Sequence, residues 1–122
     1  MENSLVIQSQ KTWERFREEV QSGLKIADNE FLENLFQTGY SFSFKVDQLI
    51  KKFDKPTLFL LGRQDVSVGY RDPWNIIESY PRATFAILDQ AGHNLQIEQE
   101  DLFNSLVDEW LNRVENQNSF KK

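Results

Sequence analysis

KPTLFLLGRQD, at residues 55–65, is an apolar run that ends in a polar loop, and TFAILDQAGH, at residues 84–93, repeats this arrangement downstream. The first loop carries Asp65, and the second carries His93, the only histidine in the chain. Continuous apolar runs of this length are typical of strands that are buried on both faces of a parallel sheet. Because the carboxyl ends of parallel strands lie at the same edge of a sheet, we expect Asp65 and His93 to emerge side by side.

The segment between the two runs predicts a β-α-β unit. Strands are expected at residues 57–61 and 84–88, joined in a right-handed crossover by a helix at residues 72–80. Asp72 is a favourable N-cap and Pro73 suits the first helical position, so the helix should begin there. Two parallel strands alone do not form a stable sheet. At least one edge of this pair therefore needs a neighbour that the sequence does not encode.

The segments outside this unit are predicted to be mainly helical. The last helix, at residues 100–115, has a wide apolar stripe formed by Leu102, Phe103, Leu106, Val107, Trp110, Leu111 and Val114. Near the N-terminus, apolar residues three and four positions apart predict one face of a helix, made by Trp13, Phe16, Val20 and Leu24. Gly23 marks a stop or a bend near the end of that helix.

Between these helices the pattern changes along the chain. A second helix is expected at residues 29–38 and should end at Gly39, with a buried stripe of Phe31, Leu32, Leu35 and Phe36. Residues 40–44 alternate between aromatic and polar side chains, which fits a short strand or an extended loop, and we favour the loop. One more short helical face is formed by Val46, Leu49, Ile50 and Phe53.

The ordered set of motifs resembles the last third of the α/β-hydrolase family. Gly62-Arg63-Gln64-Asp65 is similar to the Gly-x-x-Asp that follows a core strand in that family, and Ala91-Gly92-His93 is similar to its Gly-His. The resemblance implies an α/β fold with a partial α/β-hydrolase core, two parallel strands with helices, preceded by a helical cap segment. It assigns residues 1–52 to the cap and residues 53–115 to the C-terminal core, and leaves residues 116–122 as a polar tail that should fray.

The resemblance also implies catalytic roles for Asp65 and His93. The triad of this family runs nucleophile, acid, histidine, so Asp65 corresponds to the acid and His93 to the base. In such a triad the carboxylate accepts the Nδ1–H of the histidine, and Nε2 takes the proton of the nucleophile. From the residues alone an ordinary alternative stays open for each, because an Asp after a strand often caps a turn and a single His is often ordinary surface.

The nucleophile of the pattern is not recognisable in the sequence. The family places its serine in Gly-x-Ser-x-Gly, at a turn between a strand and a helix. The nearest match surrounds Ser41, in GYSFS at residues 39–43, where Ser43 replaces the second glycine and a predicted helix precedes the motif. No His-Gly-rich loop for an oxyanion hole is present either. Ser41 is therefore a poor candidate for the nucleophile.

Composition excludes several other classes of function. A net charge of −5 with no basic stripe argues against a nucleic-acid partner. One histidine and no cysteine give no ligand spacing for a metal, and nothing predicts a cofactor. No apolar run approaches the ~20 residues of a membrane-spanning helix, and no signal peptide is recognisable, so we expect a cytoplasmic protein.

The resemblance to the α/β-hydrolase family implies that this chain is the cap and C-terminal core part of a serine hydrolase that acts on a small-molecule ester, another acyl group or a C–C bond. The chain alone should be inactive, and its expected partner is a second copy or the missing N-terminal core part. The alternatives are a non-catalytic module that serves as an oligomeric or binding protein, and a nucleophile supplied by a second chain. Trp13, Phe16 and Phe42 could line an acyl pocket, or form the hydrophobic seam between cap and core.

Overall fold

The computed structural model describes residues 5–45 and 51–119. Helical elements of the first half are α1 (Gln10–Phe16), the π-helical turn η2 (Arg17–Gln21), α2 (Ser22–Ile26) and α3 (Asn29–Thr38). The second half contains β1 (Thr57–Gly62), α4 (Arg71–Asn75), the 3-10 turn η3 (Ile77–Ser79), β2 (Ala83–Leu88), α5 (Leu95–Glu98) and α6 (Glu100–Ser119). The predicted order of elements is therefore confirmed in outline.

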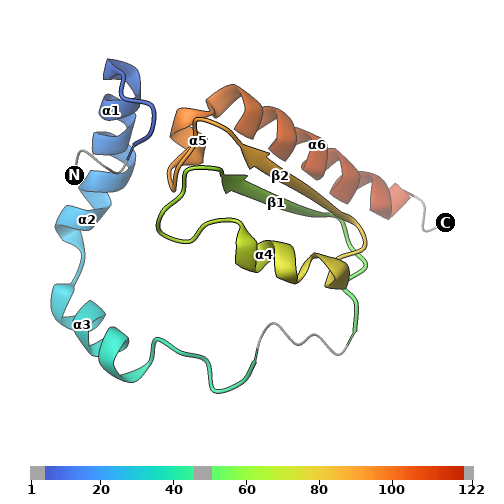
Figure 1. The fold of residues 1–122 in the computed structure, drawn as a ribbon, viewed down its shortest axis with the longest axis horizontal. Helices are drawn as coiled ribbons and strands as arrows, with labels where there is room; N and C mark the ends of the chain where they lie inside the picture. The colour runs from blue at the N-terminus through green and yellow to red at the C-terminus, as the bar shows by residue number, and fades with distance from the viewer. Residues whose placement is uncertain (1–4, 46–50, 120–122) are drawn as a thin grey trace.

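The two strands form a parallel pair with helices on either side. Thr57 lies opposite Ala83 and Gly62 lies opposite Leu88, so both strands end at the same edge. Figure 1 shows the strands between α6 and α4, with α5 and the N-terminal helices beside the edge where the strands end. This arrangement confirms the predicted α/β fold class, two parallel strands with helices.

The two faces of the sheet make different kinds of side-chain contact. On the face toward α4, the rings of Phe59 and Phe85 lie side by side at 5.8 Å, and Trp74 meets Phe85 edge-on at 5.1 Å. On the face toward α6, Trp110 Nε1 donates to the Pro56 carbonyl at 3.0 Å and Arg113 donates to Thr84 Oγ1 at 2.9 Å. Tryptophan and arginine thus combine packing with hydrogen bonds that fix α6 along the strands.

The strands are less buried than their sequence suggested. Apart from Gly62 and Leu88, their residues are only partly buried, and Ile87 is 39% exposed. Among the described residues β1 and β2 are the whole sheet, so each strand has one edge without a neighbouring strand. The predicted burial on both faces was therefore wrong for this chain by itself.

The connection between the strands also differs from the prediction. The helix begins at Arg71 with Tyr70 as its N-cap, Asp72 lies inside the first turn, and α4 ends at Asn75 before a short 3-10 turn. Proline is tolerated throughout a first turn, because the amide groups there have no partner in the helix, so Pro73 does not fix the start. The predicted N-cap at Asp72 was wrong.

The N-terminal helices follow one another from Gln10 to Ile26, through a wide turn at η2. Gly23 lies within α2 and does not end it. Leu5 and Phe16 pack against Ile97 of α5, which joins this segment to the rest of the molecule. The N-terminal segment therefore docks beside the strand ends.

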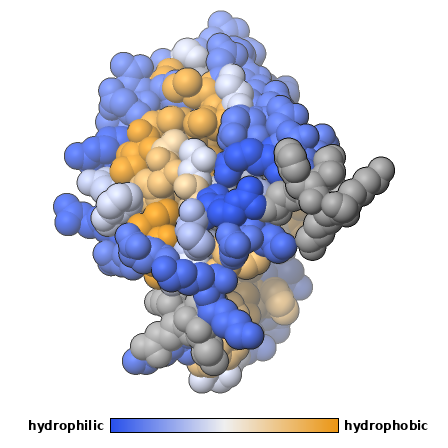
Figure 2. Space-filling view, turned by 90° about the vertical axis from the view of Figure 1, so that its right-hand side faces the viewer, coloured by the Kyte–Doolittle hydropathy of each residue, from blue (hydrophilic) through white to orange (hydrophobic). Residues whose placement is uncertain are grey.

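Helix α3 has the predicted bounds, but its apolar stripe is not buried. Asp28 caps it by accepting from the Phe31 amide at 3.0 Å, yet Phe31 is 61% exposed and Phe36 is 62% exposed. Figure 1 shows α3 away from the strands, and Figure 2 shows apolar side chains gathered at the surface on another side of the molecule. Residues 40–44 contain no strand, as expected. The short helix predicted around Val46 falls largely outside the described residues.

At the other end, α6 continues to Ser119, beyond the expected fraying at residue 116. The boundaries of the cap and core segments, at residues 52 and 115, stay a prediction. Over residues 5–45 and 51–119, no helix has the length and apolar character needed to cross a membrane.

Candidate active site

The loops that follow the two strands are joined through their backbones. Arg63 N–H donates to the Leu88 carbonyl at 2.8 Å, and Gln64 N–H donates to the Ala91 carbonyl at 2.9 Å. The contact is so close that a Cβ on Gly62 would lie 2.3 Å from the carbonyl oxygen of Gly92. Only glycine fits at Gly62, and this close approach sets the spacing between the loops that carry Asp65 and His93.

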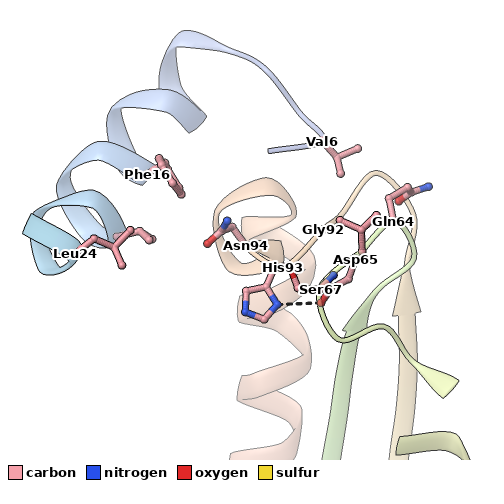
Figure 3. Close-up of a pocket in the computed structure, with 11 residues that line it drawn as sticks. Val6, Phe16, Leu24, Gln64, Asp65, Ser67, Gly92, His93 and Asn94 are labelled. Atoms are coloured by element: carbon pink, nitrogen blue, oxygen red, sulfur yellow. Dashed lines mark hydrogen bonds and ion pairs between the residues drawn. The ribbon is translucent and has the colours of Figure 1, made fainter. Parts of the chain in front are cut away.

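Asp65 and His93 meet at this edge of the sheet, as their positions in the sequence predicted. Asp65 Oδ2 lies 3.0 Å from His93 Nδ1, and Asp65 Oδ1 accepts from the amides of Ser67 at 2.8 Å and Val68 at 3.2 Å. The carboxylate of Asp65 therefore both caps a turn and contacts the imidazole of His93. Its first oxygen shapes the turn, and its second faces the imidazole (Figure 3).

The surroundings of the two side chains differ in a way that suits an acid and a base. The side chain of Asp65 is 10% exposed, whereas that of His93 is 59% exposed. Burial acts to raise the pKa of Asp65, but the hydrogen bonds with His93, Ser67 and Val68 outweigh it, and the pKa lies below its ordinary value. Asp65 is thus a charged acceptor at neutral pH, and a charged acceptor favours a proton on Nδ1 of His93.

Gln64 also joins the two loops, although no pattern in the sequence pointed to it. Its Nε2 donates to Asp89 Oδ1 at 2.6 Å, and its Oε1 accepts from the Ala91 amide at 3.1 Å. The hydrogen bond from Gln64 lowers the pKa of Asp89. The side chain thereby ties the loop of Asp65 to the loop of His93 at a second point.

Glu98 is the other residue that sequence reasoning missed. It is 7% exposed, and its carboxylate accepts from the amides of Gly92 at 2.6 Å and Ile7 at 3.1 Å, and also from that of Val6. Glu98 stands in an acidic run before a long helix, which reads as a solvated helix start. The only indication in the sequence that Glu98 could be buried was its position directly after the apolar residue Ile97, which packs in the core.

A cavity of about 390 Å³ opens between the paired residues and the N-terminal helix. Figure 3 shows Phe16 and Leu24 on the side of the helix, and Asp65 and His93 on the side of the strand loops. The cavity is lined by Val6, Phe16, Val20, Leu24, Gln64, Asp65, Val66, Ser67, Gly92, His93 and Asn94. Of the three aromatics considered for an acyl pocket, Phe16 lines the cavity. Trp13 instead stacks on Phe16 at 5.9 Å, and neither Trp13 nor Phe42 is among the lining residues.

The position of Ser41 does not suit a nucleophile. Ser41 is exposed, lies three residues after the end of α3, and is not among the residues that line the cavity. Among residues 5–45, no strand precedes Ser41 and no helix directly follows it, so the described residues lack the strand–turn–helix context of a nucleophilic serine. In the described part of the chain, no group of three or more His, Asp or Glu side chains could hold a metal ion.

A similar fold occurs in a protein of known structure. Neither a scan against protein-family models nor a search of curated proteins found a match. The crystal structure of an alpha/beta superfamily hydrolase from Oenococcus oeni PSU-1 superposes with a TM-score of 0.83 at 27% sequence identity. The match covers 92% of this chain and 42% of that protein, so this chain spans less than half the length of the protein it matches.

Proposed function

We propose that this chain, which has the fold of part of an α/β hydrolase, carries the acid and the base of a serine hydrolase, with Asp65 as the acid and His93 as the base. The observation that carries the proposal is the 3.0 Å contact between Asp65 Oδ2 and His93 Nδ1. The two residues follow neighbouring parallel strands, which is the arrangement that presents a triad acid and histidine to a common site.

The pair can move one proton in each direction during acyl transfer. Asp65 holds the proton of His93 on Nδ1, which leaves Nε2 free to accept the proton of a hydroxyl nucleophile as its oxygen bonds to the substrate carbonyl carbon. Asp65 stabilises the imidazolium that forms. Nε2 then gives the proton to the leaving group as its bond to the carbonyl carbon breaks, and a water molecule repeats the cycle to release the acid.

The hydroxyl and the oxyanion hole must come from a polypeptide segment outside the described residues. An N-terminal α/β-hydrolase core part, on the same chain or on a second one, has the required strand–turn–helix motif and a strand to cover an open edge. Within the cavity, Phe16, Val20 and Leu24 form an apolar wall opposite His93. Such a wall favours an apolar acyl or alkyl group in the substrate.

A non-catalytic oligomer or binding protein is the second candidate. It is favoured by the exposed aromatic side chains of α3 and the following segment, Phe31, Phe36, Tyr40, Phe42 and Phe44, which are 61–72% exposed. Sedimentation at micromolar concentration distinguishes the two. A stable dimer that buries this surface favours the second candidate, and a monomer that associates only with an N-terminal hydrolase core part favours the first.

The catalytic role can be tested in a chimera in which this chain replaces the matching part of the Oenococcus oeni hydrolase. A series of p-nitrophenyl esters is first screened with the unaltered Oenococcus oeni protein, and any ester that is hydrolysed serves as the substrate. In a chimera that folds, as judged by circular dichroism, we expect hydrolysis, and we expect His93→Ala and Asp65→Asn each to lower kcat by about 10³-fold or more.

Asp108→Asn is the matched control for this test. Asp108 is an exposed carboxylate in α6 and does not line the cavity, so this variant should leave the rate within about 3-fold of the parent chimera. A folded chimera without activity, or one that His93→Ala does not slow, would contradict the proposed function.

A further inference from the structure

Glu98 is a buried carboxylate that the proton transfers described above do not use. Its exposed fraction is 7%, and it closes the short helix α5, five residues after His93. A buried carboxylate is costly unless hydrogen bonds compensate its charge. The partners of Glu98 therefore indicate why the residue is there.

Within residues 5–45 and 51–119, the groups that donate to Glu98 are backbone amides, and they come from two distant parts of the chain. Oε2 accepts from the amide of Gly92, the residue before His93, at 2.6 Å. Oε1 accepts from the amides of Val6 and Ile7, which lie 92 and 91 positions away in the sequence. Val6 and Gly92 also both line the cavity (Figure 3). A single side chain thus joins the histidine loop to the N-terminal segment.

The chemistry of this junction requires a carboxylate. Only an ionised carboxylate presents acceptors on both of its oxygens, and hydrogen bonds to a charged acceptor are stronger than neutral ones. The amide of Gln has one oxygen, so its NH2 group would face an N–H donor either at Gly92 or at the Val6–Ile7 pair. One of the two connections would then be lost.

We propose that Glu98 is a positioning residue for His93, which couples the docking of the N-terminal segment to the orientation of the imidazole. When residues 6 and 7 are bound, Glu98 is held at Oε1 and fixes the backbone at Gly92, and with it the direction from which His93 meets Asp65. When that segment is displaced, the histidine loop loses this restraint. The purpose of the coupling rests on the proposed function, but the coupling itself is a property of this chain.

Glu98→Gln tests the inference in the intact chain by NMR. We expect amide hydrogen exchange at Gly92 or at Val6 and Ile7 to accelerate by about tenfold or more, as for the loss of one charge-assisted hydrogen bond. We also expect the imidazole nitrogen shifts of His93, which report which nitrogen carries the proton, to move toward those of a free imidazole. A merely structural role for Glu98 would leave the imidazole signals of the folded protein unchanged.

Glu100→Gln is the matched control. Glu100 also joins the N-terminal helix to the C-terminal half, through Lys11 at 2.7 Å and Arg15 at 3.2 Å, but its ion pairs do not involve the histidine loop. The Glu100→Gln variant removes the same charge, and it should leave amide exchange at Gly92 and the imidazole nitrogen shifts of His93 unchanged. Equal effects of the two variants, or no effect of Glu98→Gln, would overturn the inference.

Two further variants keep the outcomes separate. If Glu98→Gln does not fold, Val6→Pro is the replacement, because proline has no amide N–H and so removes one donor to Glu98 while the carboxylate and Gly92 stay in place. This variant should still shift the imidazole signals of His93. Unchanged signals would refute the coupling. Asp65→Asn reports on the proposed function. If it leaves the His93 signals unchanged, the acid–base pair is wrong, whereas Gly92 exchange in Glu98→Gln still decides the role of Glu98.

Discussion

Replacing Gly62 by alanine should separate the two loops that form the candidate site. A Cβ at this position would lie 2.3 Å from the carbonyl oxygen of Gly92 and 2.6 Å from that of Ala91, where ordinary contact begins at 3.4 Å. Both atoms are backbone, so no side-chain rotation can relieve the overlap. The loops must move apart by about 1 Å, which is enough to weaken the hydrogen bonds that Arg63 and Gln64 donate across the strand ends.

The loss of stability on Gly62→Ala has three contributions, namely the overlap, the weakened hydrogen bonds and the entropy of the unfolded chain. Overpacking a well-packed site costs about 1–3 kcal/mol, and each weakened hydrogen bond adds up to about 1 kcal/mol. Alanine also lowers the conformational entropy of the unfolded chain, which offsets about 0.4–1 kcal/mol of this loss of stability. We therefore expect Gly62→Ala to lower the free energy of unfolding by about 1–4 kcal/mol, measured by urea denaturation with circular dichroism.

Gly23→Ala is the control for this substitution. Gly23 lies within α2 and a Cβ there would meet nothing within 4 Å, so alanine should stabilise the protein by about 0.5–1 kcal/mol. If Gly62→Ala is as stable as the wild type and leaves the His93 signals in place, the close approach of the two loops does not exist as described.

Three other predictions concern Asp65, Trp110 and the activity of the chain by itself. The stability difference between the wild type and Asp65→Asn should begin to shrink as the pH falls below about 4, the ordinary pKa of an aspartate, and should be lost at lower pH. A carboxyl whose pKa is lowered in the folded state contributes stability that is fully present above its unfolded pKa and is lost as pH falls through its folded pKa. A difference that persists undiminished in urea titrations below that range would contradict this. Trp110→Phe should lower the free energy of unfolding by about 1 kcal/mol, because the hydrogen bond to the Pro56 carbonyl is lost. Trp13→Phe is the control at an exposed position and should lower it by about 0.5 kcal/mol or less in the same titration. The chain alone should not hydrolyse p-nitrophenyl esters above the buffer rate, and saturable turnover abolished by Ser41→Ala would revive that serine as the nucleophile.

The strand loops could be predicted from the sequence because local pattern and topology agree there. The apolar runs before Asp65 and His93 specify two parallel strands, and parallel strands end at one edge, so the meeting of the two side chains follows from geometry. The bounds of α3 were also predictable, because Asp28 caps its start and Gly39 follows its last residue.

The remaining features depend on partners that sequence patterns do not specify. The periodicity of Phe31 and Phe36 predicts a helix face but not whether anything covers it, and both rings are exposed. Glu98 reads as a solvated acid, because its donors are backbone amides of residues 6, 7 and 92, which no side-chain pattern reveals. Asp72 was a plausible N-cap by residue type, but the carbonyl of Tyr70 accepts from the Trp74 amide and the helix starts earlier.

The imidazole of His93 offers the most direct test of the central claim, that Asp65 and His93 form an oriented acid–base pair. Because His93 is the only histidine, its two ring nitrogens give unambiguous NMR signals. At a pH where the ring is neutral, we expect the proton on Nδ1 in the wild type. In Asp65→Asn, the amide oxygen should stay with the Ser67 and Val68 amides and turn its NH2 group toward the ring, so the proton should move to Nε2. Identical spectra for the two proteins, or a proton on Nε2 in the wild type, would contradict the claim.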